Sequence, residues 1–388
     1  MSEARIAMVA GEASGDLLGG HLLAALRMRR INLAYTGIGG PRMTGQGLES
    51  MYPMEKLAVR GYVEVLRHYR EIMGIRKRLT ERFLDERPDM FIGVDAPDFN
   101  LALERRLKAA GIPAIHYVGP SIWAWRGGRI RTIAASVSHV LVLFPFETEI
   151  YRKAGIPVTY VGHPVADTIP LVVDKVAARE QLRLPSDRLI VALLPGSRQS
   201  ELHYMADTFV QAAKKLHAEL GDVHFVCPTA SRATRDQMED AIYRNSAADL
   251  PLTLLFGHSH EALAAADLAL VASGTATLET ALYKTPMVIV YKMSSLTWQL
   301  MKRMLYTPYV GLPNVLAGEF LVDEFMQDAA TPQALADALL ALLKDAPRQQ
   351  KQVERFREMH LMLRQDNATK AAEAVLRLLD APNVRRPG

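Results

Sequence analysis

Short runs of apolar and β-branched residues alternate with longer segments of helical periodicity along the whole chain. This alternation is typical of βαβ units built around parallel sheets. In the first half the pattern predicts strands at Arg5–Ala10, Met90–Val94, Ala114–Val118 and His139–Phe144. It restarts in the second half, with strands predicted at Leu189–Leu194, His224–Pro228, Leu268–Ala272 and Met287–Tyr291. The sequence therefore predicts an α/β protein with two doubly wound, Rossmann-like domains.

The domain boundary is predicted in Gly162–Asp174, where two prolines coincide with a loss of periodicity. From Pro332 onward the pattern is helical. We therefore assign residues 1–168 to an N-terminal domain, 169–345 to a second domain, and 346–388 to C-terminal helices that pack either on the first domain or on a partner chain. Because open parallel sheets bind ligands at the carboxyl ends of their strands, we expect a ligand cleft between the domains.

Composition narrows the class of protein. With 388 residues, 49% of them hydrophobic, the chain can bury two cores. Its one cysteine excludes an internal disulfide, and its start lacks the pattern of a secretory signal, which favours the cytoplasm. The longest apolar runs are far shorter than the roughly 18 residues of a spanning helix. A net charge of +4 favours anionic partners only mildly, and we find no zinc spacing or nucleic-acid motif.

One candidate anion site is LLPGSRQSE, in which a predicted strand ends at Pro195 and Gly196. A glycine lets backbone N–H groups approach an anion, and Arg198 beside Ser197 adds a cation with bidentate geometry for phosphate. We interpret this turn as a diphosphate contact. An ordinary strand-to-helix turn with a solvated arginine explains the local pattern equally well.

A second candidate anion site is ASGTATLE, which follows a strand and opens a helix. The free N–H groups and positive dipole of a helix N-terminus favour phosphate. The residues assigned to the donor nucleotide here are Ser273, Gly274, Thr275, Thr277 and Glu279. Glu279 can accept hydrogen bonds from ribose hydroxyls, and the alternative is that it completes a capping box.

The first strand ends in a glycine-rich turn, VAGEASGD, that carries Glu12, Ser14 and Asp16. Its spacing is not the GxGxxG of dinucleotide binding, so we expect no nicotinamide cofactor. The three polar side chains are predicted at the carboxyl end of the strand. Alternatively, Ser14 or Asp16 caps the following helix, which is the interpretation we favour for Asp16.

The segment VDAPDFN places Asp95 directly after another predicted strand. A carboxylate at a strand end can act as the general base that takes a proton from a sugar hydroxyl. Asp98 or Asn100 is expected to cap the helix that follows. No paired aspartates lie beside a nucleotide motif, so we invoke no metal.

Aromatic and basic residues gather in HYVGPSIWAWRGGR. Aromatic faces beside cations suit a sugar phosphate that carries acyl chains. The acceptor and lipid contacts predicted here are Trp123, Trp125, Arg126 and Arg129. A pair of core tryptophans beside a solvated basic turn is the simpler alternative.

Several of these motifs occur together and in one order. VAGEASGD, GVDAPDFN, HYVGPSIWAWR, FPFE, YVGHP, LLPGSR, ASGTATLE and GLPNVLAG follow one another along the chain. In this order, and over essentially the whole length, the chain resembles the lipid-A-disaccharide synthases.

The resemblance implies a GT-B fold and a metal-independent, inverting transfer. The donor is then UDP-2,3-diacylglucosamine, the acceptor is 2,3-diacylglucosamine 1-phosphate, and the products are a β-1,6-linked disaccharide 1-phosphate and UDP. Carried over by motif, Asp95 or Glu12 is the base, Arg198 and Ser273–Glu279 contact the donor, and Asn314 is a further residue needed for activity. No cofactor is implied.

Because both substrates are lipids, we expect the enzyme to bind the cytoplasmic face of the inner membrane without spanning it. Arg60–Arg82 is a basic amphipathic pattern that includes Arg76, Lys77 and Arg78, and Leu296–Tyr306 adds Trp298. In either segment the apolar stripe can instead pack into the core.

Three other functions remain open from the sequence. Two are enzymes with the same layout, a peptidoglycan N-acetylglucosaminyltransferase and a UDP-N-acetylglucosamine 2-epimerase. The third is a catalytically silent sensor of nucleotide sugars or lipids. The sequence also leaves open whether the chain forms a homodimer.

Overall fold

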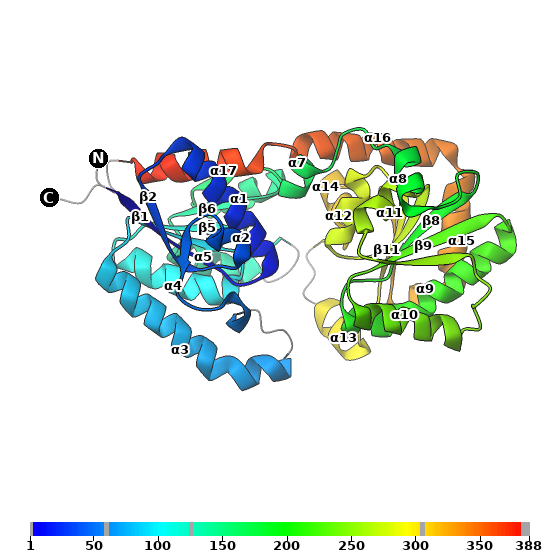
Figure 1. The fold of residues 1–388 in the computed structure, drawn as a ribbon, viewed down its shortest axis with the longest axis horizontal. Coiled ribbons are helices and arrows are strands. Elements are labelled where there is room, and N and C mark those ends of the chain that lie inside the picture. The colour runs from blue at the N-terminus through cyan, green and yellow to red at the C-terminus, as the bar shows by residue number, and fades with distance from the viewer. Residues whose placement is uncertain (1–2, 58–61, 124–126, 303–306, 382–388) are drawn as a thin grey trace. The chain divides into compact units, whose positions relative to one another are not determined.

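The computed structural model describes residues 3–57, 62–123, 127–302 and 307–381. The chain forms two compact units. The first comprises Met1–Asp167 together with Leu363–Gly388, and the second comprises Thr168–Met362 (Figure 1).

The first unit is built on a seven-stranded parallel sheet of order β3-β2-β1-β4-β5-β6-β7. Its strands are β1 (Ala4–Ala10), β2 (Leu33–Ile38), β3 (Leu48–Ser50), β4 (Met90–Val94), β5 (Ala114–Tyr117), β6 (His139–Val142) and β7 (Val158–Tyr160). Its helices are α1 (Ala13–Arg29), α2 (Pro41–Thr44), α3 (Tyr62–Glu86), α4 (Pro97–Ala109), α5 (Ile130–Ser136), α6 (Pro145–Lys153), α7 (Pro164–Thr168) and α17 (Asn367–Leu379), with 3₁₀ turns at Met54–Lys56 and Gly127–Arg129.

Alternate residues of each strand enter cores on opposite faces of this sheet. Ile6 and Met8 of β1 pack with α1 and α17, and Ala7 and Val9 pack with α3 and α4. Since side chains alternate along a strand, a strand covered on both faces must be apolar throughout. This explains the continuous apolar runs in the sequence.

The second unit holds a six-stranded parallel sheet of order β10-β9-β8-β11-β12-β13. Its strands are β8 (Leu189–Leu194), β9 (Val223–Thr229), β10 (Leu252–Phe256), β11 (Leu268–Ala272), β12 (Met287–Tyr291) and β13 (Asp323–Met326). Its helices are α8 (Lys175–Leu182), α9 (Gln199–Leu220), α10 (Arg232–Arg244), α11 (Ser259–Ala265), α12 (Thr275–Leu282), α13 (Ser295–Lys302), α14 (Leu312–Ala317), α15 (Pro332–Lys344) and α16 (Ala346–Leu363), with a 3₁₀ turn at Gln327–Ala329.

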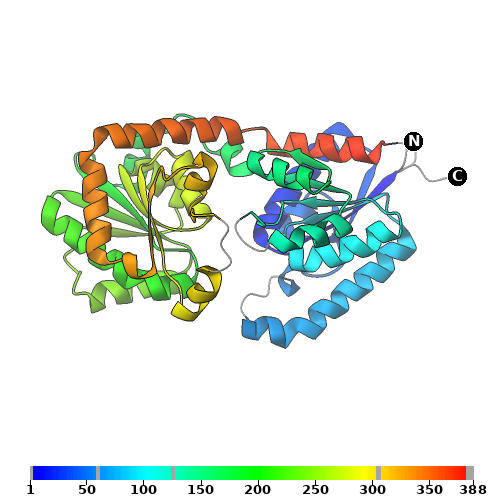
Figure 2. The ribbon, with the colours of Figure 1, turned by 180° about the vertical axis from the view of Figure 1, so that it is seen from behind.

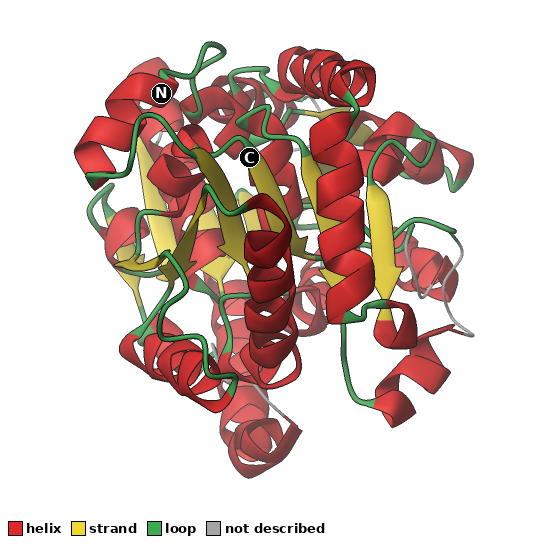
Figure 3. Ribbon diagram, turned by 90° about the vertical axis from the view of Figure 1, so that its right-hand side faces the viewer, coloured by secondary structure: helices red, strands yellow, loops and turns green. Residues whose placement is uncertain are grey.

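Helices cover both faces of the second sheet as well. One core combines α9, α10 and α15 with β8, β9 and β11, and the other combines α8, α11, α12 and α16 with the opposite face of the same strands. Figure 2 shows α15 in orange against this sheet, and Figure 3 shows the strands in yellow between red helices. Both sheets are thus doubly wound, as predicted.

Five strands were not predicted, namely β2, β3, β7, β10 and β13. Four of them, β3, β7, β10 and β13, are edge strands of their sheets, and β3 and β7 have only three residues each. β13 reads Asp-Glu-Phe-Met, and all four of its residues are half-buried. Short, polar edge strands lack the apolar run that identifies a central strand.

The C-terminal helices divide between the units, which differs from the single block 346–388 expected from the sequence. α16 contributes Phe356 and Met359 to a core of the second unit, whereas α17 packs beside α1 in the first (Figure 1). The Asp167 carboxylate accepts hydrogen bonds from the backbone N–H groups of Asp366 and Asn367 at the start of α17. This contact attaches the returning chain to the first unit.

Candidate functional site

Asp95 lies in a left-handed turn between β4 and α4. Asp95 and Ala96 have φ values of 52° and 45°, a conformation that non-glycine residues seldom adopt. The Asp95 N–H donates to the Tyr117 carbonyl at 2.8 Å. The Asn100 side-chain amide donates to the Asp95 carbonyl, also at 2.8 Å. The turn thus places the Asp95 side chain at the carboxyl end of the sheet.

The expected capping of α4 by Asp98 or Asn100 is wrong. The N-cap is Ala96, and the helix begins at Pro97. Asp98 is exposed and forms an ion pair with Arg129, while Asn100 is buried against the strand ends. α4 starts earlier than expected because Pro97, whose ring fixes φ, suits a first helical position.

The structure brings the two candidate bases, Glu12 and Asp95, together. Glu12 is the N-cap of α1, directly after β1, and its charge raises the pKa of Asp95. Burial raises that pKa most, while the Ala96 N–H and the His116 side chain lower it. A Cβ on Gly11 would lie 2.9 Å from the Ala96 Cβ, so the glycine lets the two turns approach. The Asp95 carboxyl therefore titrates above its ordinary range.

The expected capping of α1 by Ser14 or Asp16 is also wrong. The helix begins at Ala13, and Ser14 is exposed in its first turn. Asp16 is buried and accepts hydrogen bonds from the N–H groups of Gly40, Arg42 and Met43, at 2.8, 2.9 and 3.0 Å. Asp16 therefore caps α2, a helix distant in sequence.

Trp123 belongs to an aromatic cluster at the ends of β5 and β6. Its ring meets Phe146 edge-on at 5.3 Å, Phe146 stacks on Phe144 at 5.6 Å, and Phe144 lies 5.5 Å from His163. Trp123 is half-buried, so it joins the packing and still presents part of its ring to solvent. Two other predicted acceptor contacts, Trp125 and Arg126, lie outside the described residues.

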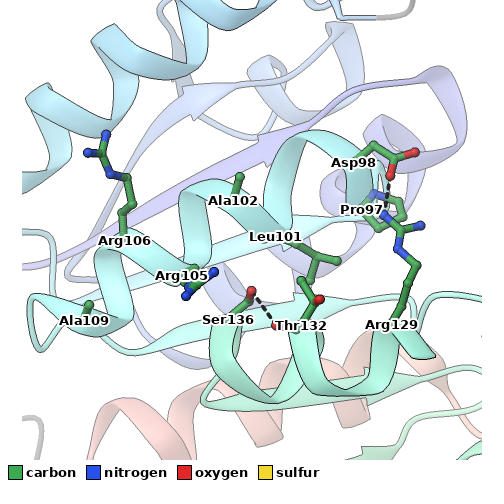
Figure 4. A pocket seen from close by; sticks show the side chains of 10 residues that line it. All are labelled: Pro97, Asp98, Leu101, Ala102, Arg105, Arg106, Ala109, Arg129, Thr132 and Ser136. Carbon is green, nitrogen blue, oxygen red and sulfur yellow. Dashed lines mark hydrogen bonds and ion pairs between the residues drawn. The ribbon is translucent and has the colours of Figure 1, made fainter. Parts of the chain in front are cut away.

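Arg129 borders a cavity of about 540 Å³ between α4 and α5 (Figure 4). The cavity begins at Pro97 and Asp98, just after the Asp95 turn, and extends along α4 to Ala109. Arg105 and Arg129 contribute cations to its wall, and the Arg129 guanidinium points toward Asp98. A partly apolar, cationic cavity thus lies next to the candidate base.

In the second unit, Gly196 forms the turn after β8, with a φ of 127°. The Glu201 carboxylate accepts hydrogen bonds from the N–H groups of Ser197 and Arg198, at 2.9 and 3.2 Å. It also pairs with the Arg198 guanidinium at 2.6 Å. A Cβ on Gly196 would lie 2.7 Å from Glu201. The N–H groups of this turn are thus occupied by the protein's own carboxylate, and the diphosphate contact stays a prediction.

The turn between β11 and α12 exposes Gly274, which is the N-cap, and Thr275. The Ser273 hydroxyl donates to the Val310 carbonyl at 3.3 Å. Thr277 was predicted to contact the donor, but its side chain is fully buried and its hydroxyl donates to the Gly274 carbonyl at 2.7 Å. Thr277 therefore shapes the turn, and the exposed backbone at Gly274 and Thr275 is the part able to meet a ligand.

Glu279 does not complete a capping box, because it lies five residues after the N-cap Gly274. Its carboxylate is 3.7 Å from His260 Nε2 and raises the pKa of that imidazole. Glu279 is half-buried, so it can still face a ligand. The capping-box role considered for Glu279 is therefore wrong, and its contact with the ribose stays a prediction.

Asn314 is fully buried, and its side chain is committed to the protein. Its amide exchanges two hydrogen bonds with the Val322 backbone, at 2.8 Å each, and donates to Glu324 at 2.8 Å. Glu324 also accepts from the N–H groups of Val310 and Gly311. Because the Val310 carbonyl receives the Ser273 hydroxyl, hydrogen bonds connect Asn314 through Glu324 and the Val310 backbone to the turn at Ser273. Its side chain is bonded to protein groups in this structure, and its part in the activity stays a prediction.

Sequence reasoning missed Glu201 and Glu324. Glu201 had a local signal, because it stands three residues after Arg198 at the start of a helix, where a capping box is expected. Glu324 lies on the edge strand β13, ten residues from Asn314, and only the tertiary structure brings it to the Val310–Gly311 turn.

Among the residues that the structure describes, no three His, Cys, Asp or Glu side chains are placed to hold a metal ion. No described helix is long and apolar enough to cross a membrane.

Comparison with known proteins identifies the family. The model of the lipid-A-disaccharide synthetase family matches residues 6–378. A lipid-A-disaccharide synthase of Dechloromonas aromatica is 59% identical over 380 residues, which cover 98% of this chain and 100% of the relative. The chain belongs to the lipid-A-disaccharide synthase family. Another relative, from Pseudomonas aeruginosa, is 51% identical over 376 residues, which cover 97% of this chain and 98% of the relative.

Family membership confirms the resemblance predicted from the motifs. The chain is a glycosyltransferase of lipid A biosynthesis, and the reaction of its family forms the lipid A disaccharide. The alternatives of a peptidoglycan transferase, an epimerase and a silent sensor are disfavoured, since 59% identity over nearly the full length links this chain to a lipid-A-disaccharide synthase.

Solved structures share the fold at low identity. CalG4, the calicheamicin glycosyltransferase, has a TM-score of 0.61 at 15% identity and covers 98% of this chain and 100% of that chain. A UDP-GlcNAc 2-epimerase from Neisseria meningitidis, solved with UDP-GlcNAc, has a TM-score of 0.60 at 12% identity, with coverages of 98% and 99%. These likenesses confirm the predicted GT-B architecture of two Rossmann-like domains.

Proposed function

We propose that the chain transfers diacylglucosamine from UDP-2,3-diacylglucosamine to the 6-hydroxyl of 2,3-diacylglucosamine 1-phosphate, giving the β-1,6-linked disaccharide 1-phosphate and UDP. The observation that carries the proposal is the half-buried Asp95 beside Glu12, in a chain of this family. A carboxylate held at a strand end, with a raised pKa, is suited to accept a proton from a sugar hydroxyl.

The acceptor chemistry belongs to Asp95. Its carboxylate removes the proton of the 6-hydroxyl, the oxygen forms a bond to the anomeric carbon, and the bond between that carbon and the diphosphate oxygen breaks. The electron pair leaves with UDP, and the anomeric configuration inverts. The cationic cavity that starts at Asp98 and Arg129 suits the phosphate and acyl chains of the acceptor, with Ser14 and Trp123 as further contacts.

The donor chemistry belongs to the second unit. The growing charge of the diphosphate is stabilised by the Arg198 guanidinium and by the N–H groups at the start of α12. Glu201 now occupies the N–H groups of Ser197 and Arg198, so a diphosphate takes the place of a carboxylate already bound there. After this exchange of one anion for another, the N–H groups of the turn still have a hydrogen-bond acceptor. No step of this chemistry needs a metal.

UDP release tests the proposal. With purified chain, we expect UDP from the two sugar lipids together and only background from either one alone. An epimerase would convert the UDP-sugar without acceptor, and a sensor would bind UDP and release none. Release from the donor alone, at the rate seen with both lipids, would contradict the assigned transfer.

We further propose that the chain docks on an anionic membrane surface through the exposed side of α3. In the described part of α3, Ile75, Leu79 and Phe83 pack into the core. There the apolar side of the helix, which was expected to face lipid, instead faces the sheet. Arg76 is half-buried and donates to the Asp98 carbonyl, which corrects its assignment as a membrane contact. Lys77 and Arg78 remain exposed.

Another aromatic and basic pair lies on α3, and a separate one lies in the second unit. Tyr69 and Arg70 precede Lys77 and Arg78 on the same helix. In the second unit, α13 holds the half-buried Trp298 and the exposed Lys302, a smaller version of the same pattern. An aromatic ring beside basic side chains suits a lipid headgroup region.

Charge reversal tests the membrane proposal. We expect the double variant Lys77→Glu/Arg78→Glu to bind phosphatidylglycerol vesicles at least ~10-fold more weakly at low salt, since each basic residue near an anionic surface contributes about 1 kcal/mol. The measurement is vesicle sedimentation, with neutral phosphatidylcholine vesicles as reference.

A matched control is available on α6. Lys153 pairs with Glu149 as Lys77 pairs with Glu81, at the same i,i+4 spacing and with similar exposure, and Arg152 is an exposed neighbour. We expect Arg152→Glu/Lys153→Glu to sediment like the parent. Equal partitioning of the α3 variant and the parent would refute the assignment.

A further inference from the structure

The face of the first sheet that α3 and α4 cover has a mainly apolar core. Ala7, Phe91 and Ala114 lie in register and belong to the core on this face. One step further toward the carboxyl ends, Gly93 pairs with His116, and beside them lies a fully buried polar cluster. It consists of Asn100, Glu104 and His116. This cluster lies directly below the turn that carries Asp95.

The cluster is closely packed. Glu104 Oε1 lies 2.7 Å from His116 Nδ1, and both side chains are fully buried. A Cβ on Gly93 would collide with Glu104 Oε1 and lie 2.9 Å from the Asn100 Cβ. Only a glycine in β4 therefore gives these two side chains of α4 access to the strand ends.

Asn100 connects the cluster to the Asp95 turn. Its side-chain amide donates to the Asp95 carbonyl at 2.8 Å and to the Val9 carbonyl at 3.2 Å. It thereby ties the last residues of β1 to a backbone with two successive left-handed residues, Asp95 and Ala96. Such a backbone persists only where the surrounding structure restrains it.

Stability does not account for this cluster. Replacing a buried ion pair by apolar residues of similar volume is often neutral or stabilising. Each member also has a buried polar atom without a hydrogen-bond partner among the described residues, namely Asn100 Oδ1, Glu104 Oε2 and His116 Nε2. Unsatisfied buried polar atoms are costly and call for an explanation. The position of all three beneath one candidate base provides it.

We propose that Asn100, Glu104 and His116 are positioning residues for Asp95: Asn100 fixes the turn, and the Glu104–His116 pair sets the charge behind the carboxylate. The inference rests on the proposed role of Asp95 as base. None of the three residues needs to touch a substrate for this role.

The charges around Asp95 come from four elements. Glu12 follows β1, His116 lies on β5, and Glu104 lies behind His116 on α4. In the first turn of α4, Asp98 is paired with Arg129. The fourth element is α3, from which Arg76 donates to the Asp98 carbonyl. His116 is the side chain in this set that lowers the pKa of Asp95, against burial and Glu12, which raise it.

The test uses His116→Gln and Asn100→Ala in the full chain, with kcat and both KM values measured across pH. For His116→Gln we expect the acidic limb of the kcat profile to move to higher pH, because the variant lacks the side chain that lowers the pKa of Asp95. For Asn100→Ala we expect kcat to fall ~10-fold or more at every pH, with KM changed less than twofold, because the base is misplaced.

His139→Gln is the matched control. This residue opens β6, the strand next to β5, and its Nε2 bonds the Thr159 hydroxyl at 2.8 Å. Burial lowers its pKa to about 4, so it is neutral in the assay range. We expect the parent pH profile. Thermal unfolding and near-UV circular dichroism identify any variant that is not folded. If one of His116→Gln and Asn100→Ala is not folded, the other tests the positioning role.

The outcomes separate the inference from the function it rests on. If folded His116→Gln keeps the parent acidic limb, or folded Asn100→Ala keeps the parent kcat, the positioning role is refuted. If instead Asp95→Asn turns over at the parent rate, Asp95 is not the base and both assignments fall.

Discussion

Asp95→Asn is expected to lower kcat by about 10²-fold or more while leaving UDP affinity unchanged. The amide keeps the size of the carboxylate but cannot take the proton of the acceptor hydroxyl. UDP affinity should persist because the diphosphate contacts assigned to Arg198 and Gly274 lie in the second unit, whereas Asp95 lies in the first. The measurements are steady-state UDP release and calorimetric titration with UDP.

The pH dependence of kcat tests the role of Asp95 as base in a second way. A base must be ionised, so kcat should rise with pH through the pKa of Asp95, which burial and Glu12 place above the usual range of an aspartate. Neutralising the neighbour in Glu12→Gln removes one of the influences that raise this pKa. The acidic limb should therefore move to lower pH, opposite to the shift expected for His116→Gln, and the rate at high pH should stay near that of the parent.

Comparison of Asp95→Asn with Glu12→Gln decides which of the two acids is the base. Should Glu12→Gln abolish turnover at all pH values while Asp95→Asn retains it, the base is Glu12. In that case the Asp95 turn would serve acceptor binding alone.

Arg198→Ala is expected to lower kcat/KM for the donor by about 10²-fold and to weaken UDP binding, because a cation aimed at a departing diphosphate stabilises charge that grows in the transition state. The Arg198 side chain is 57% exposed, so its removal should leave the thermal unfolding temperature nearly unchanged. Steady-state kinetics with varied donor and calorimetry with UDP provide the two readings.

Arg235→Ala is the control for Arg198→Ala. Arg235 also forms an ion pair with a glutamate in the same helix, Glu239, and lies in the second unit with its side chain 40% exposed. The Arg235→Ala variant should keep the kcat and KM values of the parent. Parent-like UDP affinity in Arg198→Ala would place the diphosphate elsewhere and leave Arg198 as the partner of Glu201 alone.

Much of the architecture could be read from the chain itself. The central strands β1, β4, β8 and β11 were predicted within one residue of their bounds, because a strand covered on both faces must be apolar at every position. The turns that follow them were predicted as well, since glycine and proline end a strand for local steric reasons.

Side-chain partners could not be read in this way. Asp16 was expected to cap its own helix and caps α2, and Asn314 was expected at the chemistry and instead holds Val322 and Glu324. A polar side chain bonds whichever group the fold brings near, and that group can be remote in sequence.

The sequence by itself determined the two parallel sheets, the positions of the turns that follow their central strands, and the family. Local sterics and hydrophobic periodicity act within a few residues and are therefore visible in the chain. Only the tertiary structure decided that Glu201 occupies the Arg198 turn, that Glu12 lies beside Asp95, and that Asn100, Glu104 and His116 form a buried layer beneath it. These contacts depend on strand order and helix docking, which set distances between residues that are far apart along the chain.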